Sequence, residues 1–228
     1  MVGEWYDSAV AKVPQRCTWC EGSDIYVAYH DNEWGRAVTD ETRLFEKICL
    51  EGFQSGLSWI TVLRKRESFR DAFAGFDPVK VARFSDSKVD RLLTNAGIIR
   101  HRGKIESTIN NAKRLNAMHK SGESLAGVVW SLADTEKLPG PDSLGSLPAS
   151  TPASTALSKT LKKQGWSFVG PTTMYAFMQS MGVVNDHFVG CHVRAACDRE
   201  RRAILRAGVG DTRFADTLRP TTRGGAAR

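Results

Sequence analysis

The chain has 228 residues and a formal net charge of +7, from 32 lysines and arginines against 25 acids. Its hydrophobic share of 41% and charged share of 25% are ordinary for a globular protein, which excludes a wholly disordered chain, a collagen and a coiled coil. No run approaches the roughly 18 apolar residues that a membrane span needs, so we expect no membrane association. The positive charge is consistent with an anionic partner, with nucleic acid the first candidate.

The N-terminal segment, residues 1–16, shows no hydrophobic periodicity and is expected to be an extension. It carries acids and no apolar stretch, which argues against a signal peptide. We therefore expect a cytoplasmic protein.

The whole chain contains five cysteines, and this odd number argues against a disulfide framework.

Apolar residues recur at helical spacing in several later segments. The pattern runs over 42–63 with a Gly/Ser break, and Asp77-Pro78 is a good start for a short helix. Prolines and glycines interrupt 134–153, which predicts a loop. No segment alternates apolar and polar residues, so the sequence predicts an all-α fold. The remaining helices are expected over about 87–95, from about 105 to before Gly122, and over 125–132, 153–164 and 171–181.

From Asp198 the composition shifts to arginine, glycine, threonine and alanine, and we expect a C-terminal tail over 198–228 that is flexible at least from residue 207. This tail holds eight arginines and four acids, and residues 1–16 sum to zero charge. The central domain over 17–197 therefore carries only +3 of the net charge of +7. Global charge is thus a weak guide to nucleic-acid binding here.

Cysteines and histidines near the two ends of this domain have the composition of a zinc site. His187 and Cys191 stand four residues apart, so on a helix both would face the same side. With Cys17 and His30 they make a Cys2His2 set, which suits tetrahedral zinc. The set is split by more than 150 residues, so the ion would join the N- and C-terminal segments.

Two neighbouring residues are rival zinc ligands. Cys20 completes a Cys-x-x-Cys pair with Cys17, and His192 is adjacent to Cys191. Four protein ligands would close the coordination sphere and make the zinc structural. The absence of an H-E-x-x-H motif also argues against a zinc hydrolase.

Aromatic residues are dense around the segment 25–35, with Trp19 upstream and Trp59 downstream. Glu51 follows the apolar run Ile48-Cys49-Leu50, and a carboxylate in such a setting needs a partner or a task. A carboxylate beside aromatic faces can receive a flat, cationic ring, because the faces stack on it and the carboxylate accepts its N–H groups. A partnered structural acid and ordinary core aromatics are the alternatives.

The segment from Gly165 to Thr173 joins two predicted helices through a glycine turn. A turn followed by a helix N-terminus can offer backbone N–H groups to a phosphate. A plain corner between two helices is the alternative.

Several strings along residues 17–197 together resemble the DNA-3-methyladenine glycosylase I family. Tyr-x-Ala-Tyr-His-Asp-Asn-Glu-Trp-Gly at 26–35 carries the resemblance most clearly. Further matching strings are Cys-Leu-Glu-Gly at 49–52, Gly-Leu-Ser-Trp-Ile-Thr-Val-Leu at 56–63, Gly-Ile-Ile-Arg-His-Arg-Gly-Lys-Ile at 97–105, and shorter ones at 150–154, 168–170, 177–179 and 185–187.

The resemblance implies an all-α, helix–hairpin–helix DNA glycosylase with a structural zinc ion. It carries the zinc ligands onto Cys17, His30, His187 and Cys191, which favours them over their rivals. It implies that Glu51 is the catalytic residue and that the base is bound by Trp19, Tyr26, Tyr29, Trp34 and Trp59. The hairpin that contacts DNA falls on Phe168, Val169, Gly170, Thr172 and Thr173.

The implied reaction is hydrolytic removal of 3-methyladenine from alkylated double-stranded DNA in base-excision repair, leaving an abasic site and free 3-methyladenine. The family lacks the catalytic aspartate of its superfamily, and we interpret Asp186 as structural. We expect a monomer. The alternative function is a zinc-clipped DNA-binding module without catalysis. The chain departs from the family in Cys20, in the N-terminal extension and in the Arg-rich tail.

Overall fold

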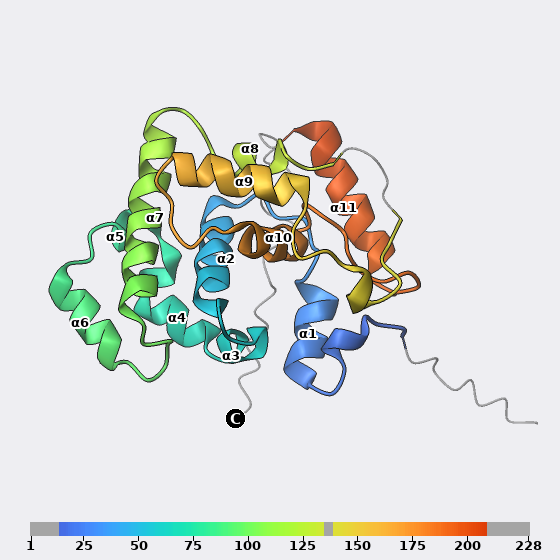
Figure 1. The fold of residues 1–228 in the computed structure, drawn as a ribbon, viewed down its shortest axis with the longest axis horizontal. Coiled ribbons are helices and arrows are strands. Elements are labelled where there is room, and N and C mark those ends of the chain that lie inside the picture. The colour runs from blue at the N-terminus through green and yellow to red at the C-terminus, as the bar shows by residue number, and fades with distance from the viewer. Residues whose placement is uncertain (1–13, 135–138, 209–228) are drawn as a thin grey trace, which may run out of the picture.

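The computed structural model describes residues 14–134 and 139–208. Within these two ranges every regular element is helical, which confirms the expected all-α class (Figure 1). The 3-10 helices are η1 (Thr18–Cys20), η2 (Ala74–Phe76) and η3 (Leu144–Ser146). The α-helices are α1 (Asp24–Asn32), α2 (Glu41–Gln54), α3 (Trp59–Leu63), α4 (Arg66–Ala72), α5 (Pro78–Val81), α6 (Asp86–Thr94), α7 (Arg102–Lys120), α8 (Leu125–Trp130), α9 (Pro152–Lys163), α10 (Pro171–Ser180) and α11 (Arg194–Ala207).

Helix α2 runs through the centre of the molecule (Figure 1). Its side chains Leu44, Phe45, Ile48 and Phe53 are buried, and the helix packs against α7, α8 and α10. Helix α9 packs on α10, while α5 and α6 pack on α7. Each large apolar side chain buried in this way contributes about 1.5–3 kcal/mol. Helix α2, which carries Glu51, is therefore held from several sides.

The helix boundaries follow local signals in the sequence. Asp77 accepts hydrogen bonds from the backbone of the first turn of α5, and Pro78 occupies that turn, as predicted. After α9 and α10, Gly165 and Gly182 adopt φ values of +84° and +72°, which favour glycine at a helix end. These signals confirm the predicted start of α5 and the predicted ends of α9 and α10.

Helices α1 and α4 are not predicted by the hydrophobic periodicity. Helix α1 has the sequence DIYVAYHDN, and only Tyr29 and His30 in it are buried. Helix α4 is mostly charged and buries Phe69 and Ala72 alone. The predicted segment over 42–63 is two helices, α2 and α3, separated at the expected Gly/Ser break.

The composition-based boundary at residue 198 falls inside α11. Cys197 and Ile204 on this helix are buried in the protein. The Arg201 guanidinium donates hydrogen bonds to the carbonyl oxygens of Val183, at 2.8 Å, and of Asp134. The helix therefore belongs to the packed domain, and Arg201 is part of its structure. Of the expected extension over 1–16, residues 1–13 lie outside the described residues, as does the tail from 209 onward.

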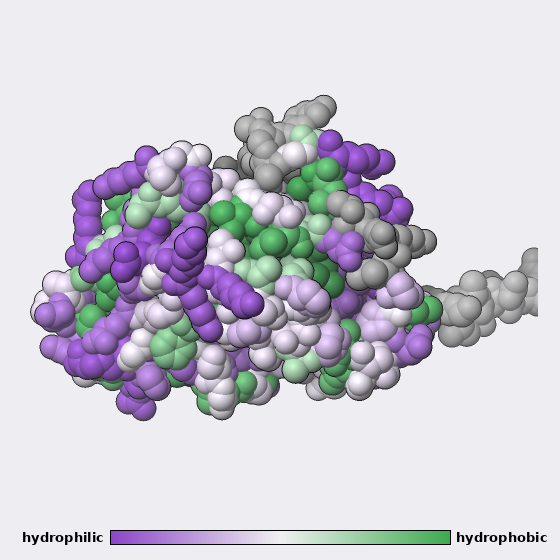
Figure 2. All heavy atoms as spheres, turned by 45° about the horizontal axis from the view of Figure 1, so that its top comes forward, coloured by the Kyte–Doolittle hydropathy of each residue, from purple (hydrophilic) through white to green (hydrophobic). Residues whose placement is uncertain are grey.

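Figure 2 shows one face of the molecule on which hydrophilic side chains predominate on the left, the side where Figure 1 has α6 and α7. Among the described helices, none combines the length and apolar character that crossing a membrane would require.

Candidate active-site pocket and metal centre

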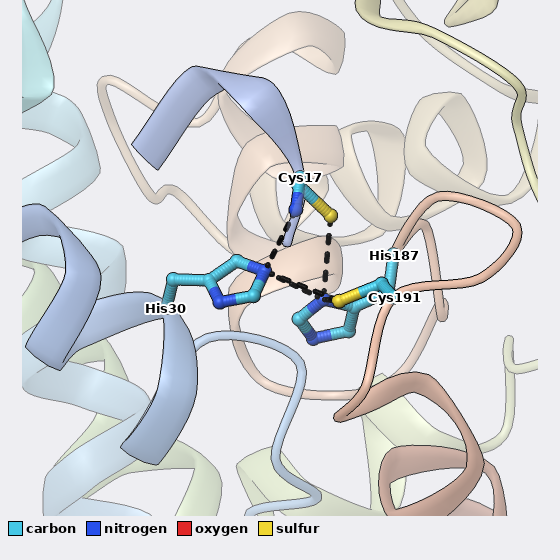
Figure 3. A group of neighbouring side chains, drawn as sticks. All are labelled: Cys17, His30, His187 and Cys191. Carbon is cyan, nitrogen blue, oxygen red and sulfur yellow. Dashed lines mark hydrogen bonds between the residues drawn. The ribbon is translucent and has the colours of Figure 1, made fainter. Parts of the chain in front are cut away.

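Two cysteines and two histidines from opposite ends of the described chain meet in one buried cluster (Figure 3). His30 Nε2 lies 3.2 Å from His187 Nδ1 and 3.4 Å from Cys191 Sγ. His187 Nδ1 lies 3.6 Å from Cys17 Sγ and 3.5 Å from Cys191 Sγ. The structure thus brings together the four residues that were predicted to hold zinc.

The spacing of these atoms fits one ion at the centre of a tetrahedron. Zinc bond lengths of about 2.3 Å to sulfur and about 2.0–2.1 Å to nitrogen place two nitrogens about 3.3 Å apart and a nitrogen and a sulfur about 3.6 Å apart. The distance between the two nitrogens is 3.2 Å, and the nitrogen–sulfur distances are 3.4–3.6 Å. Thiolate and imidazole ligands also suit zinc, so this residue set fits a four-coordinate structural zinc ion.

Hydrogen bonds outside the cluster fix both imidazole rings. His30 Nδ1 lies 2.8 Å from Asp31 Oδ1, and His187 Nε2 lies 3.0 Å from the carbonyl oxygen of Trp34. Each oxygen can accept the N–H of the outer ring nitrogen. The inner nitrogen is then free of its proton and faces the cluster, as metal ligation requires.

The two sulfurs of the cluster differ in their preference for the thiolate form. The backbone N–H of Phe188 donates a hydrogen bond to Cys17 Sγ at 3.2 Å. The pKa of Cys191 is lowered, first by the hydrogen bond with the Cys17 side chain and further by the side chains of His187 and His30. The same contact with Cys191, together with burial, raises the pKa of Cys17, so without a metal ion the pair keeps a proton on Cys17. Thiolate is the form of cysteine that binds metals.

Neither rival ligand belongs to this cluster. Cys20 Sγ donates to the carbonyl oxygen of Cys17 at 3.1 Å. His192 Nε2 lies 3.0 Å from Asp31 Oδ1, the same oxygen that orients the His30 ring. The helical spacing argument for the two C-terminal ligands is wrong, because they lie in the irregular segment between α10 and α11. Turn geometry brings them together instead, with the backbone N–H of Cys191 bonded to the carbonyl oxygen of Phe188.

A cavity of about 570 Å³, including its open mouth, lies beside the Cys2His2 cluster. Its lining is mostly apolar with a few polar groups, which is usual for small-molecule sites. The Trp19 ring connects the two sites, because its centroid lies 5.5 Å from that of His30. The cavity is lined by all six residues that were predicted to handle the base: Trp19, Tyr26, Tyr29, Trp34, Glu51 and Trp59.

Contacts among the aromatic side chains fix the shape of this cavity. Tyr26 and Tyr29 are three residues apart on α1 and so share a face of the helix. The Tyr26 hydroxyl accepts a hydrogen bond from the backbone N–H of Ile60 at 2.9 Å, which ties α1 to α3. Trp19 meets Trp34 edge-on with ring centroids 5.0 Å apart. Edge-to-face packing of this kind is favourable for aromatic rings.

Glu51 is buried at 5% exposure and has a partner that the sequence did not predict. Lys47 Nζ lies 2.7 Å from Glu51 Oε1 and donates to the Tyr29 hydroxyl at 3.0 Å. The same ammonium lies 3.2 Å from the centroid of the Trp59 ring. Burial lowers the pKa of Lys47, and the adjacent Glu51 carboxylate acts against this by raising it. The sequence signal that could have revealed this ion pair is the i,i+4 spacing of Lys47 and Glu51 on one helix.

Trp59, which lines the cavity, also carries an unpaired hydrogen-bond donor. Its indole Nε1 is buried and has no hydrogen-bond partner among the described residues. A buried donor without a partner is rare in native proteins and marks a place that a ligand or water completes. Two amides, Gln54 and Gln179, add further polar groups to the lining and were also not predicted.

The turn between α9 and α10 lies against α2. Phe168 in this turn is 39% exposed and has a φ of +56°, an uncommon value for a residue other than glycine. The side-chain oxygen of Asn111 accepts the backbone N–H of Ser167 at 2.9 Å. A Cβ atom added to Gly52 would lie 3.2 Å from the Cβ atom of Phe168. The turn therefore approaches α2 at Gly52, the residue that follows Glu51.

The five residues predicted to contact DNA differ in exposure. Phe168 and Thr172 are exposed, whereas Gly170 and Thr173 are half-buried. The Val169 side chain is buried and its carbonyl oxygen accepts a hydrogen bond from Ser158, so it has little to offer a ligand. Gly170 precedes the first turn of α10, where backbone N–H groups are available.

Asp186 has two partners that account for it without a catalytic role. The Tyr175 hydroxyl donates to Asp186 Oδ2 at 2.5 Å, and the Gln179 amide donates to the same oxygen at 2.8 Å. This agrees with a structural carboxylate.

Comparisons with known proteins place these features in a family. The methyladenine glycosylase family model matches residues 19–195. The chain is 53% identical over 178 residues to DNA-3-methyladenine glycosylase 1 of Escherichia coli, covering 78% of this chain and 95% of that protein. It is 52% identical over 178 residues to DNA-3-methyladenine glycosylase of Haemophilus influenzae, covering 77% and 96%.

Solved structures agree with the sequence comparisons. A crystal structure of 3-methyladenine DNA glycosylase I superimposes with a TM-score of 0.76 at 55% identity, covering 78% of this chain and 98% of that one. A Staphylococcus aureus 3-methyladenine DNA glycosylase I, solved to explain its recognition of 3-methyladenine, gives a TM-score of 0.74 at 31% identity, with 78% and 96% covered. The chain therefore belongs to the methyladenine glycosylase family and, as a member, is an enzyme of the DNA glycosylase class.

Proposed function

We propose that this protein removes 3-methyladenine from alkylated double-stranded DNA by hydrolysis, as the first step of base-excision repair. The observation that carries the proposal is Glu51, a buried carboxylate in a cavity walled by aromatic side chains. Aromatic faces stack on a flat base, and the carboxylate accepts hydrogen bonds from its N–H groups. The relatives in Escherichia coli and Haemophilus influenzae are named for this base.

The reaction requires little activation of the leaving group by the protein. A 3-methyladenine in DNA already carries a positive charge on its ring, so its bond to the sugar is weak and the base departs neutral. The enzyme flips the nucleotide out of the helix, which damage makes less costly, and holds the base in the cavity. Water then attacks the anomeric carbon of the sugar. Binding and modest electrostatic help are sufficient for such a leaving group.

The turn between α9 and α10 is our candidate for the DNA contact, as the hairpin of a helix–hairpin–helix element. Gly170 and the first turn of α10 offer backbone N–H groups to a phosphate, and Phe168 projects from the turn beside them. The position of this turn against α2 supports a DNA-binding surface next to the cavity.

We propose that Cys17, His30, His187 and Cys191 hold a structural zinc ion. When bound, zinc would supply a cross-link between the two ends of the domain and no open coordination position for chemistry. Trp19 and Trp34 flank the cluster and also line the cavity, so the cross-link would fix one wall of the base pocket.

The test is release of free base from methylated duplex DNA, with the products identified by chromatography. We expect 3-methyladenine and an abasic site. A DNA-binding module would release nothing. A zinc hydrolase would lose turnover on chelation while keeping its fold, whereas loss of the fold on chelation supports a structural ion. The expected monomeric state and cytoplasmic location remain predictions for sedimentation and cell fractionation.

A further inference from the structure

Lys47 occupies the part of the pocket that was expected to receive a cationic ring. Its ammonium lies 2.7 Å from Glu51 Oε1 and 3.2 Å from the centroid of Trp59, and it donates to Tyr29 at 3.0 Å. The side chain is buried at 5% exposure. The carboxylate and the aromatic face that would attract a cationic base therefore already hold a cation that belongs to the protein.

This lysine changes the net charge of the pocket wall. Among the residues that line the cavity, Lys47 and Glu51 are the two that carry a charge, and they cancel. Lys47 also lines a smaller space, whose other charged groups belong to α2, to α4 and to Glu33, the residue that follows α1. There Arg66 pairs with Glu33 at 2.6 Å, and Arg70 pairs with Glu46 at 2.8 Å. The third cation, Arg43, lies within 4.0 Å of both acids.

The reaction itself changes the charge of the ligand. In DNA the methylated ring is a cation. When the glycosidic bond breaks, its electron pair goes to the ring and cancels that charge. Water forms the new bond to the anomeric carbon and gives a proton to the solvent. A fixed positive charge beside the ring is therefore unfavourable before cleavage and tolerated afterwards.

We propose that Lys47 is a specificity-determining residue that disfavours the cationic, sugar-linked base relative to the neutral base that leaves. This inference rests on the proposed function and names the charge state that the same pocket prefers. The carboxylate remains available to the base, because the ion pair with Lys47 uses Oε1 and a carboxylate has two accepting oxygens.

Two probes separate the charge states. Free 3-methyladenine is neutral at mildly alkaline pH, and 3,9-dimethyladeninium keeps the ring cation with a methyl group in place of the sugar. The dissociation constant of each is measured by calorimetry for the wild type and for Lys47→Met. We expect the cation-to-neutral ratio of dissociation constants to fall at least about tenfold in Lys47→Met. Any steric cost of the extra methyl group is present in both proteins and cancels.

Lys104→Met is the matched control, because Lys104 is also buried but donates to the carbonyl oxygens of Phe53 and Ser55 and does not line the cavity. The cation-to-neutral ratio of dissociation constants for Lys104→Met should equal that of the wild type. If Lys47→Met does not fold, Lys47→Gln removes the charge while keeping a hydrogen-bond donor, and the same fall is expected. A second readout is the reaction on methylated DNA, in which Lys47→Met should lower both KM and kcat.

A ratio that stays within about twofold of the wild type in the Lys47 variants overturns the proposal. That result would mean that the ammonium withdraws toward Glu33 and Glu46 when a cation enters. Failure of both probes to bind any variant or the wild type would instead refute the proposed function, and the inference with it.

Discussion

Loss of the metal cluster should destabilise the protein far more than loss of another buried cysteine. The cluster joins Cys17 to His187, which are 170 positions apart. In the chain-entropy model, a link that closes a loop of this length stabilises the folded state by about 5 kcal/mol. A domain has a total stability of only about 5–15 kcal/mol, so the link would supply a large share of it.

The perturbation is Cys17→Ser, or removal of the ion from the wild type with a strong chelator. For a domain of this size, about 5 kcal/mol corresponds to a fall in Tm of about 10–20 °C. Differential scanning calorimetry measures the fall, and atomic emission measures zinc in the same samples. We expect one zinc per chain in the wild type and less in Cys17→Ser.

The control is Cys197→Ala. Cys197 is fully buried on α11 but is not a member of the cluster. This variant should keep one zinc per chain and lose less stability than Cys17→Ser. The reasoning is refuted if the purified wild type holds no metal and the two variants melt together.

Two further predictions concern a helix end and the C-terminal tail. Gly182→Ala would place a Cβ 2.7 Å from the Ala37 backbone, whereas Gly122→Ala, at a similar positive φ, meets nothing within 4 Å. Urea titration should therefore show Gly182→Ala to be the less stable by at least about 2 kcal/mol, and equal stabilities would contradict the packing. Truncation after Gly208 should flatten the salt dependence of DNA binding and spare base selectivity, and an unchanged slope would exclude the tail from DNA binding.

The fold could be predicted where one face of a helix is buried. Helix α2 has a continuous apolar face of Leu44, Phe45 and Ile48, and its periodicity is therefore clear. Helix α1 could not be found in this way, because Tyr26 and Tyr29 face a cavity rather than a core. Helix α11 could not be predicted because its many arginines are typical of a solvent-exposed tail. Arg201 is nevertheless buried, and its guanidinium donates hydrogen bonds to backbone oxygens of distant segments.

The residue types of the site could be predicted from the sequence, but the contacts between its side chains could not. The types and positions of Cys17, His30, His187 and Cys191 indicate that these residues meet, although the helix expected to bring the last two together is absent. Lys47 illustrates the limit. Its place depends on Tyr29 of α1 and Trp59 of α3 meeting α2 in space, and no local pattern in the sequence records that meeting.

The most direct test of the proposed function is single-turnover release of 3-methyladenine from methylated duplex DNA by the wild type, Glu51→Gln and Glu46→Gln. Glu46 is the matched control, since it is a buried acid on the same helix that pairs with Arg70 and does not line the cavity. A lost charged hydrogen bond costs about 1.5–3 kcal/mol, so Glu51→Gln should slow release by about 10- to 100-fold. Glu46→Gln, if folded, should release the base at close to the wild-type rate. Equal rates for Glu51→Gln and the wild type, or no base released by the wild type, would contradict the proposed function of this pocket.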